Sequence, residues 1–482
     1  MTNRKSALAI LAFTAFLTSC TVGPKYTKPS VPTAPAYSEQ PPAGYTESSG
    51  WKPAQPGDAN LRGDWWNLFG DSQLADLETQ VAAANQTLRA AEASFRQSRA
   101  AIQFNRAALY PTISAGPSIG TNRISGNNPS TLRGGLQYGS FVLPVDISYE
   151  ADLWGRIRRS ITAARENYQA AAADVENVKL ILQSELAIDY FEARSLDAQK
   201  ELLDNNVVAF QKALQLTQNR YNGGVASKAE VAQAQTQLDQ TQAQDIDVQA
   251  ARADYQHAIA VLIGKNPEEF KLPVLPLKQT PPAIPTGVPS QLLERRPDIA
   301  IAERQMAAQN EQIGIARTAF FPQLLITATG GLQSGSIVDW FAWPSRFWAV
   351  GPQVAQYIFD AGRRRAQLES AQAGYEVAVA DYRQSALTAF REVEDNLAAL
   401  RILEQESAKQ QEAIAAAEQS VELAVNRYKG GLVTYLEVIT AQSIALSNER
   451  TGVDLLRRRM DASVLLIRAL GGGWDTGRLP QG

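Results

Sequence analysis

The chain has 482 residues, and its 46 basic and 49 acidic side chains leave a net charge of −3 at neutral pH. That balance provides no basic surface for nucleic acid, so nucleic-acid binding is excluded. Catalytic motifs are also missing: the sequence has no nucleophile elbow, no phosphate-binding loop and no metal-spaced group of His, Cys and Asp. We interpret the single histidine, His257, as a solvated helix residue. The sequence therefore predicts a protein that is not an enzyme and holds neither a metal nor a cofactor.

The N-terminus has the pattern of a lipoprotein signal. An apolar run at 7–17 follows two basic residues and leads into the cleavage box Leu17-Thr18-Ser19-Cys20. At about 11 residues the run is too short to span a bilayer of roughly 30 Å as a helix. We predict a signal peptide at 1–19 and a covalent lipid on Cys20. Sorting to the outer membrane is expected, because Thr21 stands where an aspartate typically retains bacterial lipoproteins in the inner membrane.

The chain then repeats itself. The segment Asn219–Val225 (NRYNGGV) returns as Asn426–Leu432 (NRYKGGL), a spacing of 426 − 219 = 207 residues, and Ala108–Pro111 returns as Ala319–Pro322. Two copies of one unit are therefore predicted. We divide the mature chain as follows: a lipidated extended segment at 20–70, a first repeat at 71–265, a Pro-rich linker at 266–288, a second repeat at 289–470 and a tail at 471–482.

Each repeat contains two strand candidates, at about 112–121 and 137–150 in the first copy and 323–334 and 345–358 in the second. Between Phe141 and Tyr149 apolar residues alternate with Asp146 and Ser148, which is the pattern of a transmembrane barrel strand. No run of 18 or more apolar residues follows residue 20, so a membrane crossing would have to use such strands. Four strands cannot close a barrel, because the smallest need about eight. The chain is therefore expected to oligomerise.

Very long helices follow the strands. From Arg156 to Asn222 there is neither glycine nor proline, and the second copy matches this from Arg363 to Lys429 with only Gly374 interrupting. At 1.5 Å per residue such a helix reaches roughly 100 Å. Both segments are rich in Ala and Gln and have narrow apolar stripes, whereas a solid bundle favours large residues at its seams. We interpret them as helices packed side by side around a water-filled cylinder.

The long helices end in two turns, at 222–227 and 429–434. Each turn carries a glycine pair that allows left-handed backbone, and we expect positive φ at Gly223 and Gly430. Each is followed by a capping-box pattern, Ser227-x-x-Glu230 and Thr434-x-x-Glu437, which starts the next helix. The sequence thus predicts two equivalent helical hairpin tips.

Taken together, these features resemble the TolC-like outer-membrane efflux protein family, in its lipoprotein branch, over essentially the whole mature chain. The motifs that carry the resemblance are Cys20-Thr-Val-Gly23-Pro24-Lys-Tyr26, Trp65-Trp66 before Phe69, Tyr149-Glu-Ala-Asp152-Leu-Trp-Gly155-Arg156, Glu294-Arg-Arg-Pro-Asp-Ile299 and the two Arg-Tyr-x-Gly-Gly turns. The resemblance implies an α+β membrane protein: a trimeric 12-stranded outer-membrane β-barrel, four strands per chain, continuous with a long periplasmic α-helical barrel.

The resemblance also implies a function. Family members are exit ducts that receive small molecules from an inner-membrane transporter through a periplasmic adaptor protein, and their barrels contact outer-membrane lipid. Two alternatives stay open: a type I secretion channel for polypeptides, and a periplasmic coiled-coil scaffold lipoprotein. The scaffold leaves the alternating strands unexplained.

Site residues follow from the same resemblance. The adaptor would dock on the tips, at Asn222, Gly223, Gly224, Val225, Lys429, Gly430, Gly431 and Leu432. The periplasmic gate would be lined by Leu436, Glu437 and Thr440, with Ala229 and Glu230 as first-copy counterparts. Thr440 stands where the family often has an acid, and Glu437 either lines the aperture or only caps a helix. For the arginines at 156, 158, 159 and 363–365 we weigh ordinary solvated charge against contact with acidic groups at the membrane interface.

Overall fold

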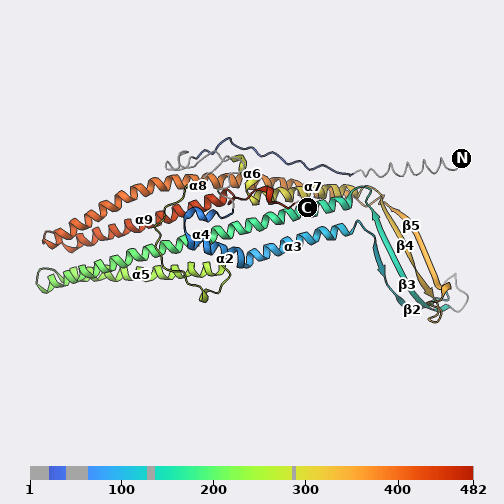
Figure 1. Ribbon diagram of the computed structural model, residues 1–482, viewed down its shortest axis with the longest axis horizontal. Coiled ribbons are helices and arrows are strands. Elements are labelled where there is room, and N and C mark those ends of the chain that lie inside the picture. The colour runs from blue at the N-terminus through green and yellow to red at the C-terminus, as the bar shows by residue number, and fades with distance from the viewer. Residues whose placement is uncertain (1–20, 40–62, 128–135, 285–288, 481–482) are drawn as a thin grey trace.

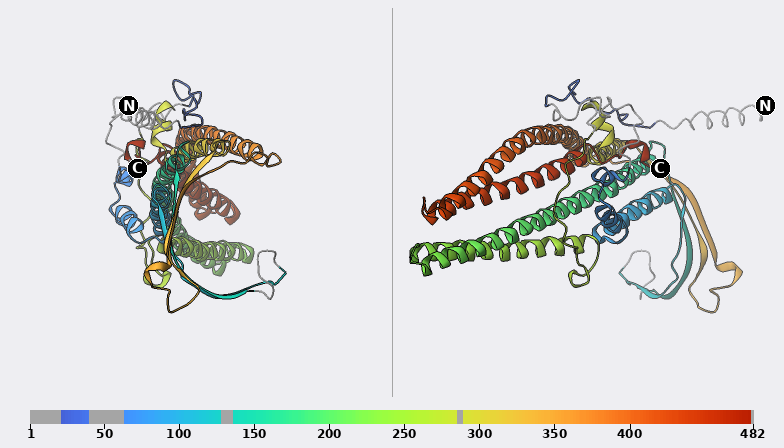
Figure 2. Two further views of the ribbon diagram at one scale, coloured as in Figure 1. Left: turned by 90° about the vertical axis from the view of Figure 1, so that its right-hand side faces the viewer. Right: turned by 60° about the vertical axis from the view of Figure 1, so that its left-hand side comes forward.

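The computed structural model describes residues 21–39, 63–127, 136–284 and 289–480. The predicted signal peptide and Cys20 lie outside these ranges. Long helices run side by side over most of the length of the molecule, and a sheet lies at one end at an angle to them (Figure 1). The end-on view in Figure 2 shows the helices and the sheet following a curved layer.

Eight α-helices and five strands are formed by the described residues. The helices are α2 (Ser72–Ala84), α3 (Gln86–Ala107), α4 (Arg156–Asn222), α5 (Lys228–Leu262), α6 (Leu292–Arg295), α7 (Pro297–Thr318), α8 (Arg363–Lys429) and α9 (Tyr435–Ala469). The strands are β1 (Thr112–Ala115), β2 (Ser118–Ile124), β3 (Leu136–Ala151), β4 (Gln323–Ser334) and β5 (Arg346–Ala355). The two repeats therefore use the same order of elements.

The helices α4 and α8 each have 67 residues and begin and end where the sequence predicted. Each begins after a left-handed glycine, Gly155 with φ 85° and Gly362 with φ 88°. An aspartate a few residues earlier accepts hydrogen bonds from first-turn backbone amides, Asp152 from Ile157 at 3.1 Å and Asp360 from Arg364 at 3.2 Å. These caps satisfy donors that a helix start leaves unpaired.

The first predicted strand is split. The expected single strand at 112–121 forms two strands, β1 and β2, which are separated by Gly116-Pro117 and both pair with β3. Pro117 has no N–H to donate to the ladder, which accounts for the interruption. The last strand also ends early, at Ala355 and not near residue 358.

The sheet has one apolar and one polar face. Its order is β1-β3-β4-β5, with β2 also beside β3, and all pairs are antiparallel. Ile147 lies opposite Ile113 on one side and Ala328 on the other. Asp146 lies opposite Thr329, whose hydroxyl donates to its carboxylate at 2.5 Å. Because successive residues point to opposite faces, the alternation seen in the sequence continues across neighbouring strands.

The helices exchange neighbours along the molecule. In the half nearest the sheet, α4 contacts α3 on one side and α7 on the other, and α7 contacts α8. In the half that ends in the tips, α4 contacts α5 and α9, and α9 contacts α8. The main core lies between these halves, where Trp65, Phe69, Tyr190 and Phe191 are buried. Helix α4 thus packs against its own repeat and against the other, whereas α8 packs mainly against helices of its own repeat.

The N-terminal segment 21–39 lies along α7 and α8 (Figure 1). Tyr26 donates its hydroxyl to Glu303 at 2.9 Å, and Glu39 pairs with Arg401 at 2.7 Å. The expected extended segment does not persist to residue 70, because Trp65–Phe69 forms a 3-10 helix. Trp65, Trp66 and Phe69 are buried there, and burial of three aromatic rings explains the local compaction.

Among the described residues, no helix combines the length and the apolar character needed to cross a membrane.

Candidate functional site: the two hairpin tips

The two predicted tips lie together at the end of the molecule farthest from the sheet (Figure 1). Positive φ occurs at the second glycine of each pair, Gly224 with 74° and Gly431 with 76°, and not at Gly223 and Gly430 as expected. The first glycine still continues the helix, because its N–H bonds back to Asn219 or Asn426. The chain reverses one residue later, where the left-handed backbone is required.

At the first tip, the predicted capping box forms. The Ser227 hydroxyl accepts from the Glu230 backbone N–H at 3.2 Å, and the Glu230 carboxylate accepts from the Ser227 N–H at 3.3 Å. Glu230 is therefore held in a local structural role.

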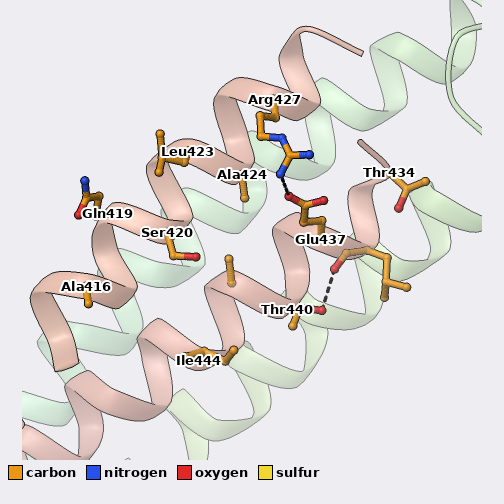
Figure 3. A pocket seen from close by; sticks show the side chains of 12 residues that line it. Ala416, Gln419, Ser420, Leu423, Ala424, Arg427, Thr434, Glu437, Thr440 and Ile444 are labelled. Carbon is orange, nitrogen blue, oxygen red and sulfur yellow. Dashed lines mark hydrogen bonds and ion pairs between the residues drawn. The ribbon is translucent and has the colours of Figure 1, made fainter. Parts of the chain in front are cut away.

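At the second tip, the predicted capping box does not form. Thr434 makes no side-chain capping bond, and the Glu437 carboxylate accepts from the guanidinium of Arg427 at 2.6 Å (Figure 3). A guanidinium carries a full positive charge that a backbone amide lacks, so the arginine competes with the cap for the carboxylate and takes it. Glu437 therefore does not cap α9, and its negative charge is paired with the positive charge of Arg427.

The difference between the tips begins with their arginines. Arg220, the repeat counterpart of Arg427, donates to the Lys429 carbonyl at 3.2 Å and lies 4.7 Å above the Tyr428 ring. Arg220 therefore binds residues of the second tip and not Glu230, whose carboxylate stays in the capping box of the first tip. The Arg-Tyr pair repeated in both turns was visible in the sequence, but its partners were not.

The gate candidates divide between the tips. Leu436, Glu437 and Thr440 line one groove between α8 and α9 (Figure 3). Leu436 is exposed, and the Thr440 hydroxyl donates to its carbonyl at 2.9 Å. Ala229 is exposed at the start of α5, on the other tip. The structure of one chain thus gathers the second-copy residues and keeps the first-copy residues apart from them.

The docking candidates form the ends of the tips. Val225 and Leu432 are exposed apolar residues in the two turns. Beneath them, Tyr428 and Tyr435 are buried with their rings 5.3 Å apart. The sequence motif of the turn included Tyr428, but Tyr435 was not singled out. Tyr428 lies in the last turn of α8 and Tyr435 begins α9, so it is the reversal of the chain between them that brings the two rings together.

The arginines at the helix starts are mostly paired within the chain. Each of four pairs joins an arginine to a nearby carboxylate: Arg156 with Glu150, Arg158 with Asp152, Arg159 with Glu311 and Arg364 with Asp360. Arg159 is buried, which corrects its interpretation as solvated helix charge. Arg363 and Arg365 are exposed.

The family described as "Outer membrane efflux protein" matches residues 77–265 and 288–472. These two ranges fall on the two repeats, and the chain belongs to this family. It is similar to a toluene efflux pump outer membrane protein, TtgC, of Pseudomonas putida, with 31% identity over 100% of this chain and 98% of that protein. It is also similar to the outer membrane protein OprJ of Pseudomonas aeruginosa, with 31% identity over 98% of both chains.

Solved structures agree with the family. The outer-membrane channel OprN superposes with a TM-score of 0.84 at 28% identity, covering 94% of this chain and 100% of that one. CusC, described in terms of transmembrane channel formation, superposes with a TM-score of 0.82 at 26% identity over 94% and 100%. The protein is therefore an outer-membrane channel of an efflux system, which favours efflux over the scaffold and secretion alternatives. Its membership of a transport family agrees with a role other than catalysis, and the lack of enzymatic activity stays a prediction.

Proposed function

We propose that three copies of the chain form a closed exit duct for small toxic molecules, with a barrel of about 12 strands in the outer membrane and a helical tunnel in the periplasm. The duct receives its cargo from an inner-membrane transporter through a periplasmic adaptor that docks on the tips. The observation that carries the proposal is the pair of open sheet edges, which the internal repeat makes complementary.

The internal repeat predicts that the two free edges of the sheet can pair with each other between two copies of the chain. Within one chain, β3 of the first copy pairs with β4 of the second. Since β5 corresponds to β3, and β1 with β2 corresponds to β4, the free edge of β5 fits the free edge of β1 and β2 on a second copy. Such a head-to-tail contact closes into a ring and leaves no strand edge unpaired in lipid.

The junctions between sheet and helices match in the same way. In the first copy, Trp154 stacks on Phe321 with ring centroids 4.7 Å apart and donates to the Pro322 carbonyl at 2.7 Å. The corresponding second-copy junction exposes Phe359, which is 86% accessible, and the turn equivalent to 319–322 exposes Tyr110 at 71%. In the ring, Phe359 of one copy would pack against Tyr110 of the next copy, as Trp154 packs against Phe321 within one chain.

Native mass spectrometry of the detergent-extracted protein tests the ring. The wild type should run as three chains, and Phe359→Asp should dissociate it, because a charge would be buried at the contact. Val338→Asp changes an equally exposed apolar residue in the loop beyond β4 and should leave the trimer intact. A monomeric wild type in the membrane would contradict the proposal.

The predicted lipid on Cys20 fits the position of the residues that follow it. The backbone N–H of Val22 donates to the Trp154 carbonyl at 3.2 Å, and a Cβ on Gly155 would lie 3.0 Å from the Thr21 methyl group. Thr21 therefore lies where the sheet meets the helices, and an acyl chain attached beside it could enter the same bilayer as the strands.

Metabolic labelling with a fatty acid tests the anchor. Cys20→Ser should remove the label. Because the strands also hold the chain in the bilayer, this variant should reduce membrane residence without abolishing it.

Efflux itself is tested by deleting the gene and screening drugs, dyes, organic solvents and metals for lost resistance. Relatives are named for pumps of toluene, solvents and antibiotics, which makes small organic toxicants the first panel. Restoration of resistance by the wild-type gene, but not by a tip variant, would link export to the tips.

A further inference from the structure

A second charged cluster lies away from the tips, where α4 of the first repeat passes α9 of the second. Arg457 on α9 donates to Asp454 and Asp461 on its own helix, each at 2.8 Å, and pairs with Glu192 on α4. The side chains of Arg457, Glu192 and Asp461 are only 22%, 18% and 16% exposed. The cluster is thus a half-buried link between two helices whose contacting residues are more than 250 positions apart.

More carboxyl groups approach the same place. Asp189 and Glu185 lie on α4 within two turns of Glu192, and Tyr255 approaches from α5. The groups that interact here are therefore three carboxyls on α4, of which Glu185 is exposed, two carboxyls and one guanidinium on α9, and one phenol on α5. One guanidinium cannot balance five carboxylates, so the fully ionised cluster is strongly negative.

Two carboxyl groups of the cluster, those of Asp189 and Asp461, have raised pKa values. Burial raises the pKa of Asp189 to about 7, and the neighbouring Glu185 and Glu192 contribute to that rise. Burial likewise raises the pKa of Asp461 to about 7, although Arg457 acts in the opposite direction. Both carboxyls therefore gain or lose a proton close to neutral pH.

The cluster is not a general feature of the repeat. At the spacing of 207 residues, Arg457 corresponds to Ala250, Asp189 to Asn396 and Glu192 to Ala399. The counterpart of Asp461 is Asp254, which is exposed on α5. The charges thus belong to the contact between α4 and α9 within one chain and are not inherited by its repeat equivalent.

We propose that this cluster is a pH-dependent clamp between the two repeats: protonated, it holds α4 against α9, and deprotonated, it loosens that contact. When Asp461 ionises, its charge faces that of Glu192 across the seam, and an ionised Asp189 adds to the negative charge on α4. The single arginine cannot compensate for all of these charges. The seam should be firm below neutral pH and should open more often as the medium becomes alkaline. The inference concerns a contact within one chain and does not depend on the trimer or on the cargo.

Hydrogen–deuterium exchange on the full-length detergent-solubilised protein tests the clamp. Exchange of peptides from α9 that include 454–461 is measured between pH 5.5 and 8.5 and normalised for intrinsic chemical rates. The wild type should lose about tenfold protection there between pH 6 and 8, while peptides from β3 keep theirs. The double variant Asp189→Asn with Asp461→Asn should show pH-independent protection.

Asp254→Asn is the matched control, because it makes the same change at the exposed counterpart of Asp461. It should retain the wild-type pH response. The proposal is overturned if the wild type shows no local loss, if all peptides change alike, or if the double variant keeps the response. Should the double variant fail to fold, Asp461→Asn alone must reduce the pH response or the clamp is rejected.

Discussion

The two repeats share a backbone plan but hold it with different partners. Arg194 in the first copy is 2% exposed, pairs with Asp197 and donates to the Pro273 carbonyl of the linker. Its counterpart Arg401 pairs with Glu39 of the N-terminal segment, near the surface. The same position on the long helix therefore binds an extended segment in each copy. In the first copy, the buried Arg194 binds the linker. In the second copy, Arg401 binds the N-terminal segment through an ion pair near the surface.

The tips show the same divergence. Arg220 crosses from the first tip to the second, whereas Arg427 stays within its own tip and pairs with Glu437. An internal repeat thus preserves which side chains are present, while the surroundings decide what each one binds. Variants at paired positions can separate these two contributions.

The largest difference is expected between Arg194 and Arg401. Arg194→Ala should lower the free energy of unfolding by about 3 kcal/mol, because it removes charge-assisted hydrogen bonds to Gln73 and the Pro273 carbonyl, while Asp197 keeps its pair with Arg252. Arg401→Ala should lower it by about 1 kcal/mol or less, because its pair with Glu39 is only partly buried and is screened by solvent. Denaturant unfolding of the detergent-solubilised protein measures both. Equal losses would show that the two positions are energetically equivalent after all.

Substitutions of the turn glycines test whether each tip is needed for efflux. Gly224→Val and Gly431→Val should each strain the turn by about 1 to 3 kcal/mol, because φ is positive at both. Resistance conferred by the gene should then fail while the trimer persists on native mass spectrometry. Gly223→Ala and Gly430→Ala are the controls and should be tolerated, since φ is negative there. Normal resistance with Gly431→Val would argue against docking at this turn.

The short helices of the two copies bury different glutamates. Glu78 on α2 is fully buried with both carboxyl oxygens unpaired, and burial raises its pKa well above the usual value. The folded state therefore holds the proton longer than the unfolded chain, and stability should fall as pH rises above the unfolded pKa of about 4.5. Glu78→Gln should flatten this part of the curve of melting temperature against pH. An unchanged curve would show that Glu78 does not titrate on unfolding.

Glu303 on α7 is also buried, but unlike Glu78 it accepts a hydrogen bond, from the hydroxyl of Tyr26. Tyr26→Phe should lower the free energy of unfolding by about 1 to 3 kcal/mol, because it leaves a buried acceptor less satisfied. Urea titration would measure the loss, with Tyr138→Phe, at an exposed tyrosine, as the control.

The smallest effect on stability concerns Glu437. If three copies face one axis about 8 Å apart, each carboxylate pair would repel by roughly 2 kcal/mol at an effective dielectric near 20, and the ring would favour cations. In a planar bilayer, Glu437→Gln should weaken cation selectivity and block by divalent ions, with a stability loss of about 1 kcal/mol or less. Arg427→Gln should strengthen both, because it frees the carboxylate.

Leu436→Ala at the same groove should enlarge the conductance by removing an apolar obstruction, and Glu230→Gln should affect only the first cap. If Glu437→Gln and Arg427→Gln leave selectivity and block unchanged, the gate lies elsewhere on the helices.

The repeat, the ends of α4 and α8 and the alternating strands could all be predicted from the amino-acid sequence. These depend on local properties: absence of glycine and proline over a long stretch, and a period of two between apolar side chains. The residues of the candidate gate and tips were named from turn motifs and from family resemblance, and their roles stay predictions.

The partner of each charged group, in contrast, became known from the folded chain. Thr434-x-x-Glu437 has the same local pattern as Ser227-x-x-Glu230, yet Arg427 takes its carboxylate. The cluster around Arg457 joins helices from different repeats, so no sequence window contains both sides of it. Local pattern fixes an element, whereas the pairing and protonation of a side chain depend on charges and burial that the folded chain alone brings together.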